Sequence, residues 1–188
     1  MPVTRRRSGG AESPDGGSRG SIDSVNDVRD LCLRLLTARP RTREELRQAL
    51  ARRRVDERTA DEVLSRLDEV GLVDDVAFAE QWVHSRHTYQ GMARRALVAE
   101  LRRKGVAGPV AAQAAAAVDT DAEEDRARQL VRRRLRDTVP TDEVAKARRL
   151  VGMLARKGYP EGLAYRVVRE ELHRAGHAAE PLDDIVVD

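Results

Sequence analysis

The sequence of 188 residues contains one cysteine, Cys32, so it forms no intramolecular disulfide and no zinc site built from cysteine ligands. Aromatic residues make up only 3 % of the chain, which disfavours a β-sandwich and favours helices packed through Leu, Val and Ala. A chain with so little cysteine suits a reducing compartment. We therefore expect a cytoplasmic protein.

Long apolar runs are also absent. A membrane-spanning helix needs about 20 consecutive apolar residues, whereas the longest comparable stretch, 110–118, is rich in alanine and interrupted by Gln113. Arg5, Arg6 and Arg7 are not followed by an apolar run, so they do not resemble the start of a secretory signal. The sequence therefore predicts no membrane association.

Motifs of catalytic and cofactor-binding sites are scarce. No P-loop is present, and no dinucleotide-binding glycine motif follows an expected strand. Glu80, His84 and His87 share one helix face by spacing, but a metal site needs a further ligand, and a solvated face accounts for them. Asp74 and Asp75 stand where a helix begins, and they fit a capping role. We therefore expect no enzymatic activity, no cofactor and no metal.

Charge is what the sequence has in abundance. Charged residues make up 36 %, with 35 basic and 32 acidic residues and a net charge of +3. Lysine occurs only at positions 104, 146 and 157, so 32 of the basic residues are arginine. Guanidinium groups bind phosphate and carboxylate in a bidentate manner. A GC-rich genome would produce the same bias, so the composition is compatible with a polyanionic partner without requiring one.

The apolar residues between about 25 and 175 follow a helical period throughout, and capping residues, prolines and glycines divide the region into nine helices. Pro40 ends the first helix and Thr42 begins the second, while Gly105 and Gly158 end the fifth and the eighth. The nine helices fall into three sets of three. The sequence therefore predicts an all-α fold in which three three-helix units form an elongated, curved array.

An internal repeat supports this grouping. The segment 97–106, LVAELRRKGV, aligns with 150–159, LVGMLARKGY, and more weakly with 46–55, where Arg54 stands at the glycine position. A period near 50 residues is typical of stacked helical units. The expected divisions are a disordered N-terminal tail at 1–24, repeats at 25–72, 73–119 and 120–175, and an acidic C-terminal tail at 176–188.

Basic residues recur at similar positions in the later repeats, and stacked units would present them as a spaced row suited to an extended polyanion. Because aromatic residues are few, and Phe78 and Trp82 fit a core better than a stacking platform, we expect weak contact with the DNA backbone without sequence preference. The alternative is that basic and acidic helix faces pair within the chain. The candidate partner- and DNA-binding residues are Arg94, Arg95, Arg102, Arg103, Lys104, Arg132, Arg133, Arg148, Arg149, Arg156 and Lys157.

One stretch of the chain resembles a known family. It consists of GLVDDVAFAEQWVHSR at 71–86, then Gly91, then ELRRKGV at 100–106. This order resembles that of the bacterial RecX regulatory proteins, and the resemblance covers roughly residues 28–173, including the threefold repeat. The matching positions are Asp74, Asp75, Phe78, Ala79, Arg86, Gly91, Glu100, Leu101, Lys104 and Gly105.

The resemblance implies a non-enzymatic, all-helical protein that binds the RecA recombinase and its single-stranded-DNA filament. It further implies inhibition of RecA strand exchange, ATPase and coprotease activity, and hence a role in DNA repair, homologous recombination and the SOS response. The chain departs from the family pattern at Arg54 and in its Gly- and Ser-rich start. We expect it to act as a monomer.

A helix-turn-helix transcriptional regulator that binds duplex DNA is the alternative. Short turns between three helices are shared with that motif, whose recognition helix carries Arg, Asn or Gln to the bases. The expected third helices of the first two units, at 57–70 and 109–118, are instead acidic or rich in alanine. This composition favours the RecX-like interpretation.

Overall fold

The computed structural model describes residues 24–136 and 143–176, which form nine α-helices and one π-helical turn, η1, and contain no strand. The predicted all-α fold is therefore confirmed. The elements are α1 (Val25–Ala38), α2 (Arg43–Ala51), α3 (Glu57–Glu69), α4 (Asp75–Ser85), η1 (Arg86–Gln90), α5 (Arg94–Arg103), α6 (Gly108–Ala115), α7 (Thr120–Arg136), α8 (Glu143–Arg156) and α9 (Glu161–Arg174).

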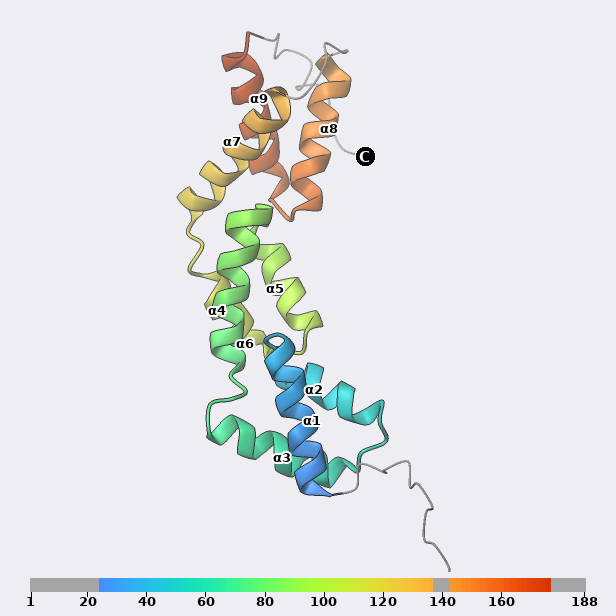
Figure 1. The fold of residues 1–188 in the computed structure, drawn as a ribbon. Helices are drawn as coiled ribbons and strands as arrows, with labels where there is room; N and C mark the ends of the chain where they lie inside the picture. Colours follow the sequence, from blue (N-terminus) through green and yellow to red (C-terminus); the bar gives the residue numbers. More distant parts are fainter. Residues whose placement is uncertain (1–23, 137–142, 177–188) are drawn as a thin grey trace, which may run out of the picture.

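The helices pack in three successive units, α1–α3, α4–α6 and α7–α9, which follow one another along the length of an elongated molecule (Figure 1). Each unit has its own apolar core. Leu46, Leu97 and Leu154 are fully buried, one in each core. Burial of a leucine side chain stabilises a fold by about 1.5–3 kcal/mol. Each of these leucines therefore helps to hold the second helix of its unit in place.

The starts of several helices follow from local capping, as the sequence predicts. The Thr42 hydroxyl accepts a hydrogen bond from the backbone N–H of Glu45 at 3.1 Å at the start of α2. Asp74 caps α4 by accepting from the N–H groups of Val76 and Ala77, both at 2.9 Å. These bonds satisfy N–H groups that have no partner within the first turn of a helix.

Consecutive units are joined through their second helices. At the first junction the Thr42 hydroxyl donates to the carbonyl of Lys104 at 2.6 Å, which brings the end of α5 onto the start of α2. The backbone N–H of Arg43 also donates to Asp75 Oδ1 at 2.9 Å. A carboxylate from the next unit therefore satisfies an N–H in the first turn of α2.

The second junction repeats this arrangement. The N–H of Ala93, at the start of α5, donates to the carbonyl of Lys157 at 2.9 Å, and the N–H of Arg94 donates to Glu123 Oε1 at 2.8 Å. The helices α2, α5 and α8 thus lie end to end, and we call them the column (Figure 1).

Two glycines permit this close stacking. Gly105 and Gly158 have φ of 84° and 88°, and a Cβ on either would lie 2.1 Å from the Cβ of Glu44 or 2.5 Å from that of Ala96. Arg54, at the equivalent place in the first unit, also has a positive φ of 60° but is exposed. The repeat therefore needs glycine only where another unit of the described chain packs against it.

The predicted tails, at 1–24 and 176–188, lie outside the described residues except for Ser24 and Gly176. Within the described ranges, no helix has the length and apolar character needed to cross a membrane.

Candidate nucleic-acid interface

The exposed surface of the column carries arginines with no acidic partner. Three of the predicted residues lie on α5 and three on α8, and all six are exposed. None of their side chains takes part in an ion pair or a hydrogen bond in the part of the chain that the structure describes. Their charges are therefore free to act on a ligand. They are Arg95, Arg102, Arg103, Arg148, Arg149 and Arg156.

These arginines recur in register with the repeat. Arg103 and Arg156 are the last residues of α5 and α8, and Arg52, just after α2, is the third member of the set. Arg95 and Arg148 form a second equivalent pair. A ten-residue helix is about 15 Å long, so successive members lie farther apart than the Debye length of about 8–10 Å. The column therefore presents separate positive charges along its length.

A hollow of about 350 Å³ adjoins this row at α8. Leu150 and Met153 line it together with four cations of α7 and α8. The lining cations are Arg134, Lys146, Arg149 and Arg156.

Lys104 is instead a structural residue of the first junction. Its ammonium group lies 2.7 Å from Glu45 Oε1 and 4.2 Å from the centre of the Trp82 ring. Burial raises the pKa of Glu45, but hydrogen bonds from Lys104 and Arg39 outweigh it, so the pKa of this carboxyl lies below its usual value. The only lysine in the basic segment 94–104 is thus engaged within the chain.

Arg94 and Lys157 are engaged at the second junction. Arg94 Nε lies 3.6 Å from Glu123 Oε2, and the Glu123 side chain is only 5 % exposed. Lys157 donates to the carbonyl of Gln90. Burial lowers the pKa of Lys157, and the nearby charge of Arg126 lowers it further. Both predicted residues hold the second and third units together.

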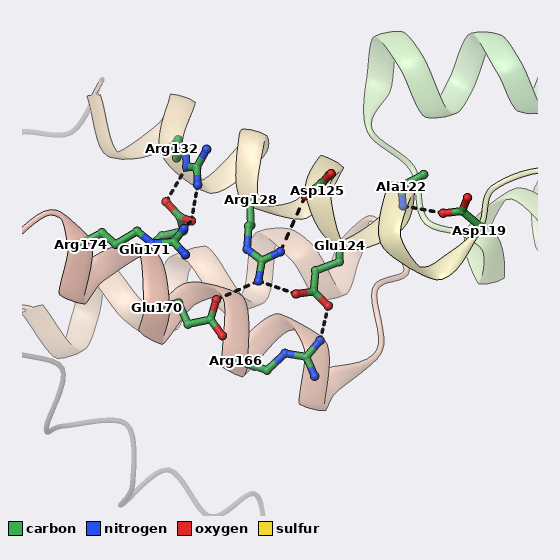
Figure 2. Close-up of polar contacts among 10 residues, drawn as sticks. All are labelled: Asp119, Ala122, Glu124, Asp125, Arg128, Arg132, Arg166, Glu170, Glu171 and Arg174. Atoms are coloured by element: carbon green, nitrogen blue, oxygen red, sulfur yellow. Dashed lines mark hydrogen bonds and ion pairs between the residues drawn. The ribbon is translucent and has the colours of Figure 1, made fainter.

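Two arginines of α7, Arg128 and Arg132, pair with acids of α9 (Figure 2). Arg132 donates to both oxygens of Glu171, at 2.7 and 2.9 Å, and Arg174 contacts the same carboxylate. Hydrogen bonds from Arg132 hold the pKa of Glu171 below its usual value. Arg128 bridges Glu170 and the acids of α7. Internal pairing therefore accounts for Arg128 and Arg132 of α7, but not for the six exposed arginines of α5 and α8.

Arg133 is the remaining predicted residue. It is exposed on α7 and has no ion pair in the described part of the chain. It stands one residue beyond Arg132, so the helical turn of about 100° per residue directs it away from Glu171.

The part of the chain that the structure describes gathers no set of side chains for a metal ion. Within the described residues, no group of three or more His, Cys, Asp or Glu side chains is placed to hold a metal ion. Glu80, His84 and His87 line one hollow but do not form such a group. Cys32 is buried, and burial raises the pKa of its thiol, which disfavours the reactive thiolate.

Three stacked three-helix units with a basic column define the chain as a helical-repeat protein. Comparison with protein families gives the same division: models of the first, second and third three-helix domains of RecX match residues 29–67, 74–114 and 121–168. The chain belongs to the RecX family of regulatory proteins.

Curated relatives share most of the length. The chain is 56 % identical over 161 residues to the regulatory protein RecX of Amycolatopsis mediterranei, covering 86 % of this chain and 92 % of the relative. It is 51 % identical over 178 residues to the regulatory protein RecX of Streptomyces coelicolor, covering 94 % and 95 %. Both relatives are named as regulatory proteins rather than as enzymes.

Solved structures share the fold. The crystal structure of RecX from Lactobacillus salivarius matches with a TM-score of 0.67 at 18 % identity, covering 78 % of this chain and 96 % of that one. A second crystal structure of a regulatory protein RecX also gives a TM-score of 0.67, at 20 % identity, covering 80 % of this chain and 74 % of that one.

Proposed function

We propose that this protein is a non-enzymatic inhibitor of the RecA recombinase that acts as a cytoplasmic monomer. In this proposal it binds RecA and the RecA filament on single-stranded DNA, and it suppresses strand exchange, ATP hydrolysis and coprotease activity. Membership of the RecX family supports RecA as the partner. The observation that carries the proposal is the row of unpaired arginines along the column.

The row suits a long, regular polyanion better than a small molecule. Equivalent arginines such as Arg103 and Arg156 stand one unit apart, so they reach phosphates that are several nucleotides apart on one strand. Contacts of this kind neutralise the DNA backbone and carry no sequence information. The proposed DNA contact is therefore weak by itself and independent of sequence, and contacts with RecA protomers add to it.

Inhibition follows if the protein binds one state of the filament more tightly than another. A rigid array that spans several protomers fixes their spacing, and a ligand shifts a conformational equilibrium only through its differential affinity for the two states. Fixed spacing opposes the changes that accompany ATP hydrolysis. Arginines on the DNA side also compete with a second DNA strand.

The experiment that tests this function is a titration of single-stranded-DNA-dependent RecA ATPase activity with the protein, at two salt concentrations. The proposal predicts inhibition that weakens at the higher concentration, because phosphate contacts depend on salt. Full RecA ATPase activity and strand exchange at saturating protein would contradict it. A footprint on one preferred duplex sequence, without an effect on RecA, would favour the helix-turn-helix alternative instead.

A further inference from the structure

The π-helical turn η1 carries an exposed aromatic side chain at the second junction. Tyr89 is 78 % exposed, whereas Phe78 and Tyr159 are buried and Trp82 and Tyr165 are partly covered, and all five lie in the described residues. Gly91, with φ of 63°, ends the turn. A Cβ at Gly91 would lie 2.7 Å from a methyl group of Leu130. The turn that carries Tyr89 is thus packed directly against α7.

Two cations of the third unit donate hydrogen bonds to the backbone of η1. The Arg126 guanidinium donates to the carbonyl of Thr88, and the Lys157 ammonium donates to the carbonyl of Gln90, so their acceptors flank Tyr89 in the chain. The remaining hydrogen bond of Arg126 is to Gln129 Oε1 at 2.8 Å. The Nε atom of Arg126 is buried without a partner among the described residues.

The second junction differs from the first in the partner of its lysine. At the first junction the equivalent lysine, Lys104, is neutralised by Glu45 at 2.7 Å. In the second repeat the position of Glu45 is occupied by Ala96, which packs against Gly158. No carboxylate forms an ion pair with Lys157 or Arg126 in the described part of the chain. Two positive charges without a carboxylate partner in the described residues therefore lie against the turn that carries Tyr89.

An exposed ring on a turn that two such cations contact has the chemistry of a binding site for one unstacked nucleotide. A base stacks on the face of an aromatic side chain whatever its sequence, and the adjoining phosphate is held by cations. Duplex DNA offers the phosphates but keeps its bases stacked. The exposed Arg156, at the end of α8, and Arg95, in the first turn of α5, flank the same junction. A strand bound here therefore continues onto the column.

We propose that Tyr89, Arg126 and Lys157 form a single-nucleotide subsite, in which the Tyr89 ring stacks on a base of single-stranded DNA and the two cations bind the adjoining phosphate. The subsite adds detail to the proposed function. It rests on that function only in taking the longer assembly to be the RecA filament. It gives the protein a preference for single strands that the phosphate contacts of the column do not supply.

The test measures the affinity of the purified protein, without RecA, for three fluorescent ligands: oligo(dT), the same length of abasic oligonucleotide, and a duplex. The variants are Tyr89→Ala, Tyr89→Phe and Lys157→Gln. We expect Tyr89→Ala to weaken oligo(dT) binding roughly tenfold and to change the other two affinities less than about twofold. Tyr89→Phe keeps the ring and should bind like the wild type. Lys157→Gln should weaken binding to all three ligands.

Equal binding of oligo(dT) by the wild type and Tyr89→Ala would overturn the proposal. An equal loss for all three ligands would also overturn it, because it would mean that the substitution disturbs the junction rather than a stacked base. If Tyr89→Ala reduces RecA inhibition but leaves oligo(dT) binding unchanged, the ring faces a protein and the subsite is wrong. If the oligonucleotide results hold but RecA is not inhibited, the subsite stands and the proposed function fails.

Discussion

Arg54 and Gly105 take the same left-handed backbone conformation after α2 and α5, with φ of 60° and 84°. The two positions differ in what faces them. Arg54 is exposed, whereas a Cβ at Gly105 would lie 2.1 Å from the Cβ of Glu44. The turn after α2 therefore has only the constraint of a left-handed backbone. The turn after α5 has that constraint and also lacks room for a Cβ atom.

This difference predicts opposite effects of substitution. Gly105→Ala should lower the free energy of unfolding by about 2–4 kcal/mol, because it adds left-handed strain and a steric overlap. Arg54→Gly should raise it by about 0.5–1 kcal/mol, since relief of strain exceeds the entropy that glycine adds to the unfolded chain. Urea denaturation measures both changes.

Gly71→Ala is the matched control for this prediction. Gly71 has φ of 71°, and a Cβ added to it would have no other atom within 4 Å. Gly71→Ala adds only left-handed backbone strain, so it should lower the free energy of unfolding less than Gly105→Ala does. Equal costs at the two glycines would show that the close approach of α5 to α2 contributes nothing.

The first junction should weaken in acid through Glu45. The pKa of this carboxyl is lowered in the fold by Lys104 and Arg39, so the folded state favours the ionised form. The resulting stability is present above the unfolded pKa of about 4.3 and is lost as the pH falls through the lower folded pKa. Glu45→Gln should therefore destabilise the protein at pH 7 and much less at pH 3. A pH-independent difference in urea denaturation would contradict this prediction.

Arg132 should contribute to the stability of the fold and not to the affinity for DNA. Because both oxygens of Glu171 accept from it, and Glu171 is only 3 % exposed, Arg132→Gln leaves a buried carboxylate with fewer donors. We expect a lower Tm with DNA affinity changed less than about twofold. A loss of DNA affinity in the folded variant would place α7 in the interface.

Arg103 and Arg156 should account for a measurable part of the salt dependence of DNA binding. Each phosphate contact on a single strand contributes about 0.7 to the slope of log K against log salt. The double variant Arg103→Gln/Arg156→Gln should therefore reduce the slope by about 1.4. The control Arg34→Gln/Arg58→Gln removes two exposed arginines of α1 and α3, and it should leave the slope unchanged. Equal slopes for all three proteins would exclude direct phosphate contact.

The fold was predictable because its determinants are local. The period of the apolar residues, the cap at Thr42 and the glycines after α5 and α8 act within a few residues, and the structure confirms each of them. The internal repeat then grouped the helices correctly into three units. The turn η1 was not expected, since its stability depends on contacts with α7 and Lys157 rather than on its own sequence.

The candidate site was predictable only as a set of cations. Which of them is paired depends on residues far away in the chain, such as Glu45 for Lys104 and Glu171 for Arg132. No spacing rule connects residues that are 59 or 39 positions apart. The sequence does not bring Tyr89 and Arg126 together, because their joint placement arises from the second junction.

The most direct test of the account is the inhibition of RecA ATPase activity on single-stranded DNA by three proteins: the wild type, Arg103→Glu/Arg156→Glu and the control Arg34→Glu/Arg58→Glu. The two variants have the same net charge, so they differ only in whether the column is altered. With circular dichroism confirming equal helicity, the column variant should need at least about tenfold more protein for half inhibition, while the control should match the wild type. Equal inhibition by the folded column variant and the control would contradict the claim that the arginines of the column engage the filament.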